Sequence, residues 1–238
     1  MKINKINKIN RIQKLLGKTN IVGVINSVDD LRSALRHPDS FDIAEWRVDE
    51  CVDESVWSGL LALNKPVIIT VRAASEGGCD HSWGPAERMQ LYRRYMQTQL
   101  VAFIDIELST AVDFQSLINE AHDMGVGVIT SYHDFKRTVS GEGFGQLHSK
   151  FIEIHGDILK IAATPANMHE LIEFERFALY ARERFQTPIA AMAMKEYGRL
   201  SRVLEAKAGA PLVYCSIDAA RVTGQWKADT LKKLLADL

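Results

Sequence analysis

Eight short apolar runs rich in β-branched residues alternate with segments of helical periodicity along the 238 residues of this chain. Strands that read as continuous apolar runs are typical of a parallel sheet covered on both faces. Eight βα units favour an α/β fold of the (β/α)8 TIM barrel type, in a single domain, over an open doubly wound sheet. No G-x-G-x-x-G follows the first run, which excludes the simplest nucleotide-binding interpretation. The expected strands cover residues 21–25, 41–48, 67–71, 101–108, 126–132, 157–165, 188–192 and 211–215.

The first 19 residues differ from the rest of the chain. They contain Lys-Ile-Asn three times, are basic, and lack the apolar core of a secretory signal. Isoleucine at every third position could give one apolar helical face, as in a transit peptide or a membrane-surface helix. We expect instead a frayed or loosely docked end with no assigned function. The predicted organisation is a variable basic segment, residues 1–19, and a barrel domain, residues 20–238. Within the barrel, the Gly/Ser-rich stretch 140–145 is expected to be a loop before a helix over residues 146–155.

Composition narrows the possible partners. Hydrophobic residues make up 47% of the chain and the formal net charge is −1, so charge gives no reason to expect nucleic acid or an anionic membrane as a partner. No apolar run approaches the ~18–20 residues of a membrane span. The three cysteines are widely and irregularly spaced. They make neither a disulfide framework nor a metal-binding pair, which is typical of the reducing cytoplasm.

A lysine and a histidine in two successive strands suggest a chemistry. Lys160 is flanked by apolar residues within strand 157–165, and His133 falls at the C-terminal tip of the strand before it. Burial among hydrocarbon lowers the pKa of a lysine and yields a neutral amine that can attack a carbonyl. A histidine one strand away can move protons near neutral pH. The pair indicates Schiff-base chemistry with a proton shuttle; the alternative is a barrel-mouth lysine that points into solvent or pairs with a nearby acid.

Other polar residues follow the C-terminal ends of the strands, which is where the active sites of such barrels lie. In strand 41–48, period-two alternation places Glu45, Arg47 and Asp49 on one face, toward the lumen. A Glu45–Arg47 salt bridge that merely fills the barrel is the structural alternative. The remaining candidates at this end are Arg72, Glu76, Asp105, Glu107, Met192, Met194, Arg202 and Gln225.

These candidates stand in longer motifs that run in order from about residue 20 to the C-terminus. The motifs are Glu45-Trp46-Arg47-Val48-Asp49, Arg72-(x)₃-Glu76-Gly77-Gly78, Ser131-Tyr132-His133-Asp134-Phe135, Leu159-Lys160-Ile161-Ala162, Met192-x-Met194, Gly198-(x)₂-Ser201-Arg202 and Gly224-Gln225. In these motifs the sequence resembles type I 3-dehydroquinate dehydratase, the Schiff-base dehydratase of the shikimate pathway. The N-terminal repeats lie outside the resemblance.

The resemblance implies a role for each candidate. Lys160 would form an imine with the C3 ketone of 3-dehydroquinate, and His133 would act as general base and acid, oriented by Glu76. A cationic iminium is an electron sink that stabilises the enamine formed when C2 loses its proton. Neither a cofactor nor a metal is therefore expected. The residues implied to bind substrate are Glu45, Arg47 and Arg72 around the ring hydroxyls, Arg202 at the carboxylate, Gln225 in the lid, and Met192 and Met194 against the ring.

The chain departs from the family pattern at two positions that are also expected to touch substrate. Arg221 stands where the family's lid has a serine, and a bulky cation there could contact the substrate carboxylate or obstruct the pocket. Tyr214 stands where a phenylalanine is common, at the end of the last strand. These changes leave the imine chemistry intact and bear on the affinity and identity of the substrate.

The expected function is that of a cytoplasmic lyase, a homodimer by family analogy, which dehydrates the small molecule 3-dehydroquinate to 3-dehydroshikimate. One alternative is a class I aldolase, which also uses a lysine on the sixth strand of a barrel. The motifs around Glu45 and His133 disfavour it. The other alternative is a non-catalytic barrel that binds a shikimate-like acid. The altered lid at Arg221 favours such a binder, whereas a binder has no use for an imine-forming lysine such as Lys160.

Overall fold

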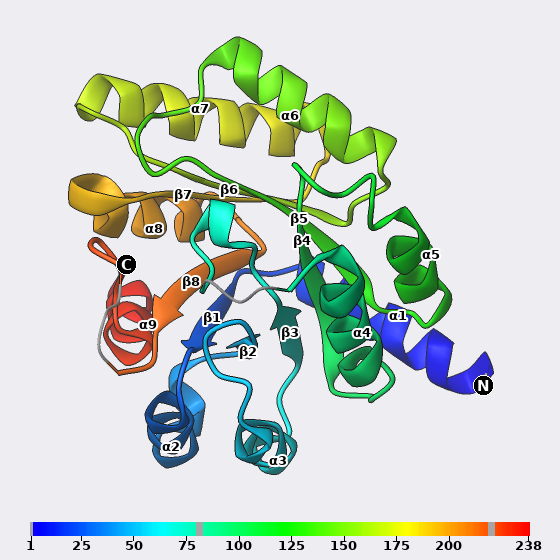
Figure 1. The fold of residues 1–238 in the computed structure, drawn as a ribbon. Helices are drawn as coiled ribbons and strands as arrows, with labels where there is room; N and C mark the ends of the chain where they lie inside the picture. Colours follow the sequence, from blue (N-terminus) through cyan, green and yellow to red (C-terminus); the bar gives the residue numbers. More distant parts are fainter. Residues whose placement is uncertain (1, 80–82, 219–221) are drawn as a thin grey trace.

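Eight parallel strands form a nearly closed barrel, which Figure 1 shows from one end. The computed structural model describes residues 2–79, 83–218 and 222–238. The strands are β1 (Asn20–Ile25), β2 (Ile43–Arg47), β3 (Val67–Thr70), β4 (Val101–Glu107), β5 (Gly127–His133), β6 (Ile158–Ala163), β7 (Ile189–Ala193) and β8 (Leu212–Ser216). Hydrogen-bonded ladders join them in the order β7-β6-β5-β4-β3-β2-β1-β8, and β7 contacts β8 across the remaining gap. The predicted (β/α)8 barrel is confirmed.

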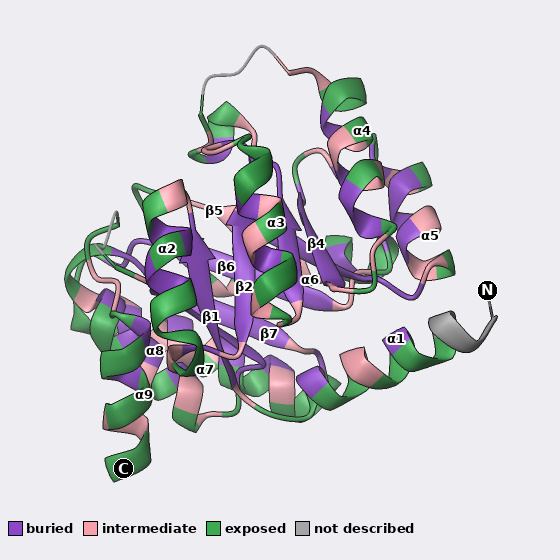
Figure 2. Cartoon of the chain, turned by 90° about the horizontal axis from the view of Figure 1, so that it is seen from below, coloured by how far each residue is buried: buried purple, intermediate pink, exposed green. Residues whose placement is uncertain are grey.

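Helices surround this barrel and turn their apolar faces toward it. They are α2 (Val28–Arg36), α3 (Glu54–Leu63), α4 (Pro85–Met96), α5 (Gln115–Asp123), α6 (Gly141–Glu153), α7 (Met168–Phe185), α8 (Gly198–Lys207) and α9 (Ala228–Asp237), with short 3₁₀ turns at Pro38–Ser40, Ala74–Glu76 and Lys195–Tyr197. Figure 2 shows the strands buried and the helices exposed along their outer side. Four helices begin at a polar side chain that accepts a hydrogen bond from a first-turn N–H, namely Ser27, Asp53, Ser140 and Asn167.

The barrel lumen is apolar at its N-terminal end and polar at its C-terminal end. Strand side chains that point inward at the N-terminal end form a buried lumen cluster, whose members include Val22, Ile43, Ile68, Phe103, Ile129, Ile158 and Leu212. Because successive side chains of a strand point to opposite faces, the outward set packs under the helices in a second, larger core. The polar residues of the C-terminal end are thereby set on a rigid floor.

The N-terminal segment is a docked helix, α1 (Lys2–Leu16), and the expectation of a frayed or loosely docked end is wrong. The apolar face of α1 contributes Leu15, which is 7% exposed, to the lumen cluster, and Ile12 packs beside it. Polar contacts fix the same helix, because the Arg11 guanidinium donates to the carbonyls of Gln99 at 2.9 Å and Leu100 at 2.7 Å. Figure 2 shows α1 lying across one end of the barrel, away from the C-terminal ends of the strands.

Helix α6 also begins earlier than expected, at Gly141, so the stretch 140–145 is not a loop. The Ser140 hydroxyl accepts a hydrogen bond from the Gly143 N–H at 3.1 Å and caps the helix. A Cβ built on Gly141 would lie 2.5 Å from the ring of Phe177 in α7, so a glycine is needed where the two helices meet. Three glycines lowered the apparent helical propensity of a segment that tertiary packing holds in a helix.

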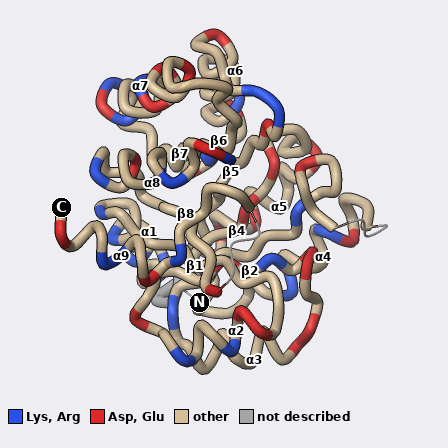
Figure 3. Tube along the Cα trace, turned by 90° about the vertical axis from the view of Figure 1, so that its left-hand side faces the viewer, with Lys and Arg blue, Asp and Glu red and all other residues tan. Residues whose placement is uncertain are grey.

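The distribution of charged residues over the surface agrees with the nearly neutral net charge. The formal net charge is −1, and Figure 3 shows acidic and basic positions interspersed along the peripheral helices, α7 among them. Within the described part of the chain, no helix combines the length and the apolar character that crossing a membrane requires.

Candidate active site

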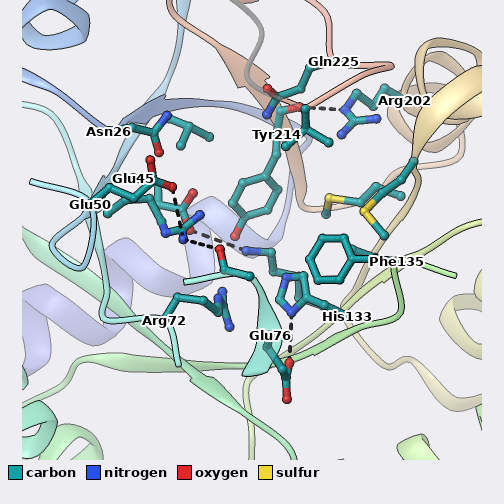
Figure 4. Close-up of a pocket in the computed structure, with 18 residues that line it drawn as sticks. Asn26, Glu45, Glu50, Arg72, Glu76, His133, Phe135, Arg202, Tyr214 and Gln225 are labelled. Atoms are coloured by element: carbon teal, nitrogen blue, oxygen red, sulfur yellow. Dashed lines mark hydrogen bonds and ion pairs between the residues drawn. The ribbon is translucent and has the colours of Figure 1, made fainter. Parts of the chain in front are cut away.

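The C-terminal ends of the strands surround a cavity of about 300 Å³ (Figure 4). Eleven of the twelve site residues expected from the sequence line it, namely Glu45, Arg47, Arg72, Glu76, His133, Lys160, Met192, Met194, Arg202, Tyr214 and Gln225. The twelfth, Arg221, lies outside the described residues. Parallel strands bring residues that are far apart in sequence to one end of the barrel, as the predicted barrel implied.

Lys160 lines this cavity from β6 and is 4% exposed. Its Nζ lies 2.8 Å from Asp105 Oδ2 and 3.5 Å from Glu45 Oε1. The same Nζ lies 4.0 Å from the centroid of the Tyr214 ring. The expectation that hydrocarbon surrounds the Lys160 amine is wrong. Two carboxylates and an aromatic face surround it, so the lysine pairs with a nearby acid, as one alternative from the sequence had it. These contacts hold the amine in one place.

Asp105 is the central carboxylate of the site and is fully buried. Its Oδ1 accepts a hydrogen bond from the Ser131 hydroxyl at 2.6 Å, and Arg72 Nη2 lies 2.9 Å from its Oδ2. Burial acts to raise the pKa of Asp105, yet the positive charges of Arg72 and Lys160 hold it well below its ordinary value. Asp105 is therefore ionised at any physiological pH and compensates two buried cations.

Arg72 is bound on several sides by the protein itself. Besides Asp105, its guanidinium contacts Ser131 Oγ at 2.5 Å and Glu107 Oε1 at 3.6 Å. These carboxylates outweigh burial and raise the pKa of Arg72. Arg72 consequently acts as a fixed positive charge beside Lys160 and His133.

His133 ends β5 and is held by Glu76, as the sequence led us to expect. His133 Nδ1 lies 3.1 Å from Glu76 Oε2, and the Ser109 hydroxyl donates to Glu76 Oε1 at 2.6 Å. Burial, with the charges of Arg72 and Lys160, lowers the pKa of His133 well below its ordinary value. Burial raises the pKa of Glu76. The imidazole is thus neutral near pH 7 and free to accept a proton.

Glu45 and Arg47 both line the cavity, but the salt bridges of the described residues do not pair them. Glu45 Oε1 accepts from the Thr70 hydroxyl at 2.8 Å and contacts Lys160. Arg47 instead grips Asp49 through Nε at 3.0 Å and Nη2 at 2.8 Å. The simple Glu45–Arg47 bridge considered from the sequence is therefore wrong. Glu45 contacts Lys160, and Arg47 binds Asp49 in the loop after β2.

Arg202 reaches the cavity from α8 and is 3% exposed. Its Nε donates to the Tyr214 carbonyl at 2.8 Å, while Nη1 donates to carbonyls of residues that include Gly198 at 2.8 Å and Gly224 at 3.2 Å. Burial lowers the pKa of Arg202. Among the described residues, no carboxylate lies within 4 Å of this guanidinium. Arg202 is a buried cation without a described counter-ion.

The apolar side of the cavity comes from β7, and its edge comes from the segment after β8. Met192 and Met194 are 6% and 5% exposed, and both border the cavity. Gln225 lies at the rim, and the Gln225 N–H donates to the carbonyl of Val222 at 3.2 Å. A ligand would therefore meet sulfur and hydrocarbon on one side and charged groups on the other.

A profile of the type I 3-dehydroquinase family matches residues 21–238. The chain belongs to this family. It is accordingly an enzyme of the hydro-lyase class. A curated 3-dehydroquinate dehydratase from Salmonella typhimurium is 32% identical over 235 residues, which cover 94% of this chain and 90% of that protein.

Solved structures agree with this membership. The type I 3-dehydroquinate dehydratase of Clostridium difficile, described with covalently modified comenic acid, is 27% identical with a TM-score of 0.82 and covers 92% of each chain. The 3-dehydroquinate dehydratase of Geobacillus kaustophilus has the same TM-score of 0.82 at 21% identity, over 92% of this chain and 90% of that one, and supports the fold alone. Helix α1 precedes the part of the chain that the family profile matches.

Sequence reasoning missed several residues of this family member's site. Asp105 received no role, although a carboxylate on the inward face of an apolar strand requires a buried cation as partner. Asn26, Glu50 and Phe135 also line the cavity, from the ends of β1, β2 and β5. Phe135 stacks on His133 with ring centroids 6.2 Å apart. Asn26 and Glu50 were not singled out and Phe135 appeared only within the His133 motif, because each follows its strand in a loop whose course local sequence does not determine.

A metal site is not evident in the part of the chain that the structure describes, where no three His, Cys, Asp or Glu side chains are placed to hold an ion. The carboxylates that line the cavity contact protein cations or the histidine instead: Glu45 contacts Lys160, Glu50 contacts Arg47, and Glu76 contacts His133.

Proposed function

We propose that this enzyme dehydrates 3-dehydroquinate to 3-dehydroshikimate through an imine on Lys160, with His133 transferring protons. The observation that carries the proposal is a buried lysine that lines the cavity, in the same site as a histidine that is neutral and held by Glu76. Family membership supplies the substrate class, and the coarser activity is that of a type I 3-dehydroquinase.

The first stage is formation of the imine. Lys160 must lose a proton before Nζ can attack the C3 ketone, and Asp105 is a poor acceptor because its pKa is held low. His133 is the neutral base that takes this proton. The ketone oxygen then takes one proton from the attacking nitrogen and one from His133 and leaves as water, which gives the iminium.

The second stage is the elimination. His133 takes a proton from C2, and the iminium accepts the electron pair as an enamine. The enamine electrons then expel the C1 hydroxyl, which leaves as water with the proton returned by His133. Hydrolysis of the imine releases the product and the Lys160 amine. Glu76 keeps the histidine ring in one orientation throughout, since it binds Nδ1.

Substrate binding would use both the charged side and the apolar side of the cavity. Arg202 lacks a described counter-ion and would bind the carboxylate, and Met192 and Met194 would pack against the ring. The ring hydroxyls would contact Glu45, Arg47 and Arg72, with Gln225 and Arg221 completing the lid. An arginine–carboxylate pair both orients and holds an anionic substrate.

The test is trapping of the imine. Borohydride is added to the enzyme with 3-dehydroquinate, and the adduct is located by intact mass and peptide mapping. We expect one ligand-sized adduct on Lys160 in the parent enzyme. In Lys160→Ala we expect no adduct and a turnover number reduced by at least about 1,000-fold. Lys136→Ala, which removes an exposed lysine outside the cavity, serves as the control and should retain both. Dehydration by Lys160→Ala near the parent rate contradicts the mechanism.

We further propose that the enzyme is a homodimer and works in the cytoplasm. The widely spaced cysteines suit a reducing compartment, and the dimer rests on family analogy. Light scattering after size-exclusion chromatography measures the mass directly. A mass close to 26.7 kDa for the pure enzyme at micromolar concentration excludes the dimer.

A further inference from the structure

The hydroxyl of Tyr214 is a buried polar group for which the described residues offer no partner. Tyr214 lies on β8, points into the lumen and is 3% exposed. Its Oη is buried and forms no hydrogen bond with any described residue. Buried hydroxyls are normally paired, because an unpaired one loses its bonds to water without replacement. Such an atom beside a reactive lysine needs an explanation.

The hydroxyl lies among the groups that surround Lys160. Lys160 Nζ lies 4.0 Å from the centroid of the Tyr214 ring. Burial raises the pKa of Tyr214 well above its ordinary value, and the charges of Glu45 and Asp105 add to the effect. The phenol therefore stays protonated and can act only as a neutral donor or a weak acceptor.

The two carboxylates that act on Tyr214 are already occupied. The donors to them are Ser131, Arg72 and Lys160 at Asp105, and Thr70 and Lys160 at Glu45. The hydroxyl thus has a proton to donate and no acceptor among the described protein groups. Any ligand that bonds to Nζ must place its neighbouring atoms near the Tyr214 ring, so such a ligand can supply the missing acceptor.

We propose that Tyr214 is a specificity-determining residue whose hydroxyl donates to a hydroxyl on the substrate carbon next to the carbonyl that Lys160 attacks. This inference rests on the proposed function. Figure 4 shows Tyr214 and His133 entering the cavity from different sides, so the two serve different substrate oxygens. His133 handles oxygens that leave as water, whereas Tyr214 needs an acceptor that stays on the ring. The preferred ligand class is an α-hydroxy ketone.

The experiment compares Tyr214→Phe with the parent enzyme on two substrates, 3-dehydroquinate and its analogue without the C4 hydroxyl. The substitution retains the ring face over Lys160 and removes one oxygen. We expect kcat/KM for 3-dehydroquinate to fall about 10-fold and kcat/KM for the deoxy analogue to change less than about 2-fold. Borohydride trapping on Lys160 should persist in the variant.

Thermal unfolding separates this role from a structural one. Removal of an unpaired buried hydroxyl should leave the Tm of Tyr214→Phe unchanged or higher. Tyr92→Phe is the matched control, because Tyr92 Oη accepts a hydrogen bond from the Val71 N–H at 3.0 Å and also donates to the Asp105 carbonyl. That variant should have a lower Tm.

Three results would overturn the inference. They are an equal loss on both substrates, no loss on either, or a fall in the Tm of Tyr214→Phe that matches Tyr92→Phe. The parent enzyme reports on the proposed function separately. If it shows neither turnover nor an adduct on Lys160, the proposed function fails and the inference fails with it; normal turnover with unchanged discrimination overturns the inference alone.

Discussion

At the scale of single residues, the cavity contains buried cations in two different states. Arg72 and Lys160 face Asp105, which carries the compensating charge. Arg202 is held by backbone carbonyls through Nε and Nη1. A buried charge without an opposite charge is costly, so the anion that completes Arg202 is best supplied by a ligand.

Arg202→Ala is therefore expected to raise KM for 3-dehydroquinate about 10-fold or more, since hydrogen bonds to charged groups are worth ~1.5–3 kcal/mol. The effect on kcat should be smaller, because the lysine and histidine are untouched. Steady-state kinetics gives both constants. Arg199→Ala, on the same helix with its guanidinium over Trp226, is the control and should bind normally. An unchanged KM in Arg202→Ala argues against a carboxylate at this position.

The second residue-scale prediction concerns pH. Burial and neighbouring cations lower the pKa of His133 below 6.5, so the base stays active and kcat/KM should decline only at pH values below that. The stability of the fold also decreases as pH falls. Between the lowered folded pKa and the unfolded value of about 6.5 the unfolded chain binds more protons, so stability contributed by neutral His133 is lost as pH falls through this window.

The measurement is kcat/KM and Tm from pH 5 to pH 8 for the parent and two variants. His133→Asn should flatten the acid limb of Tm and reduce turnover. His148→Asn removes another histidine with a lowered pKa, which lies outside the cavity and contacts Thr187 Oγ1 at 2.8 Å; its kcat/KM profile should match the parent. An acid limb centred above pH 6.5 is incompatible with this assignment.

At the scale of elements, two neighbouring carboxyl groups lie between α7 and α8, outside the cavity. Arg182 on α7 holds Glu205 on α8 through two contacts of 2.8 Å. Glu175, also on α7, lies beside Glu205. Burial and the charge of Glu205 raise the pKa of Glu175 to about 9. The folded protein therefore keeps one carboxyl proton here at neutral pH.

Glu175→Gln should consequently stabilise the protein at pH 8. Between pH ~4.5, the unfolded value, and pH ~9, the folded chain binds one more proton than the unfolded chain, so stability falls as pH rises. A neutral amide removes this dependence. We expect the variant to have the higher Tm at pH 8 and a difference that shrinks toward pH 5. Glu173→Gln, at a partly exposed partner of Arg176 on the same helix, is the control, and parallel Tm profiles for all three proteins contradict the prediction.

Elements were predictable from sequence where local pattern and packing agree. The strand expected over residues 21–25 is β1 (Asn20–Ile25), which differs from the prediction by one residue. The start of α6 was missed because Gly141 is required by the Phe177 ring of another helix. Helix α1 was missed because its apolar face is stabilising only when it packs against the open end of the barrel. In both cases the deciding contact is distant in sequence, and no local propensity reports it.

At the scale of the whole molecule, the strict alternation of strands and helices was enough to predict the barrel and the end that carries the site. Parallel strands place all their C-terminal ends together, so Glu45, His133 and Lys160 could be grouped from the sequence alone. Their partners could not be. Pairing of Lys160 with Asp105, and of Arg47 with Asp49, depends on side-chain directions inside the lumen, where several charges compete for few partners.

The same architecture separates stability from catalysis, and this separation can be tested at the end of the barrel covered by α1. Leu15 is 7% exposed and packs with the lumen cluster, far from the cavity along the strands. Leu15→Ala should lower the free energy of unfolding by ~2–4 kcal/mol through lost burial and a residual void, while KM stays unchanged. Chemical denaturation and kinetics at 25 °C measure the two quantities. Ile9→Ala, on the same helix but 37% exposed, should cost much less. A rise in KM for Leu15→Ala would contradict this separation, because it would mean that the packing of α1 at one end of the lumen affects the cavity at the other end.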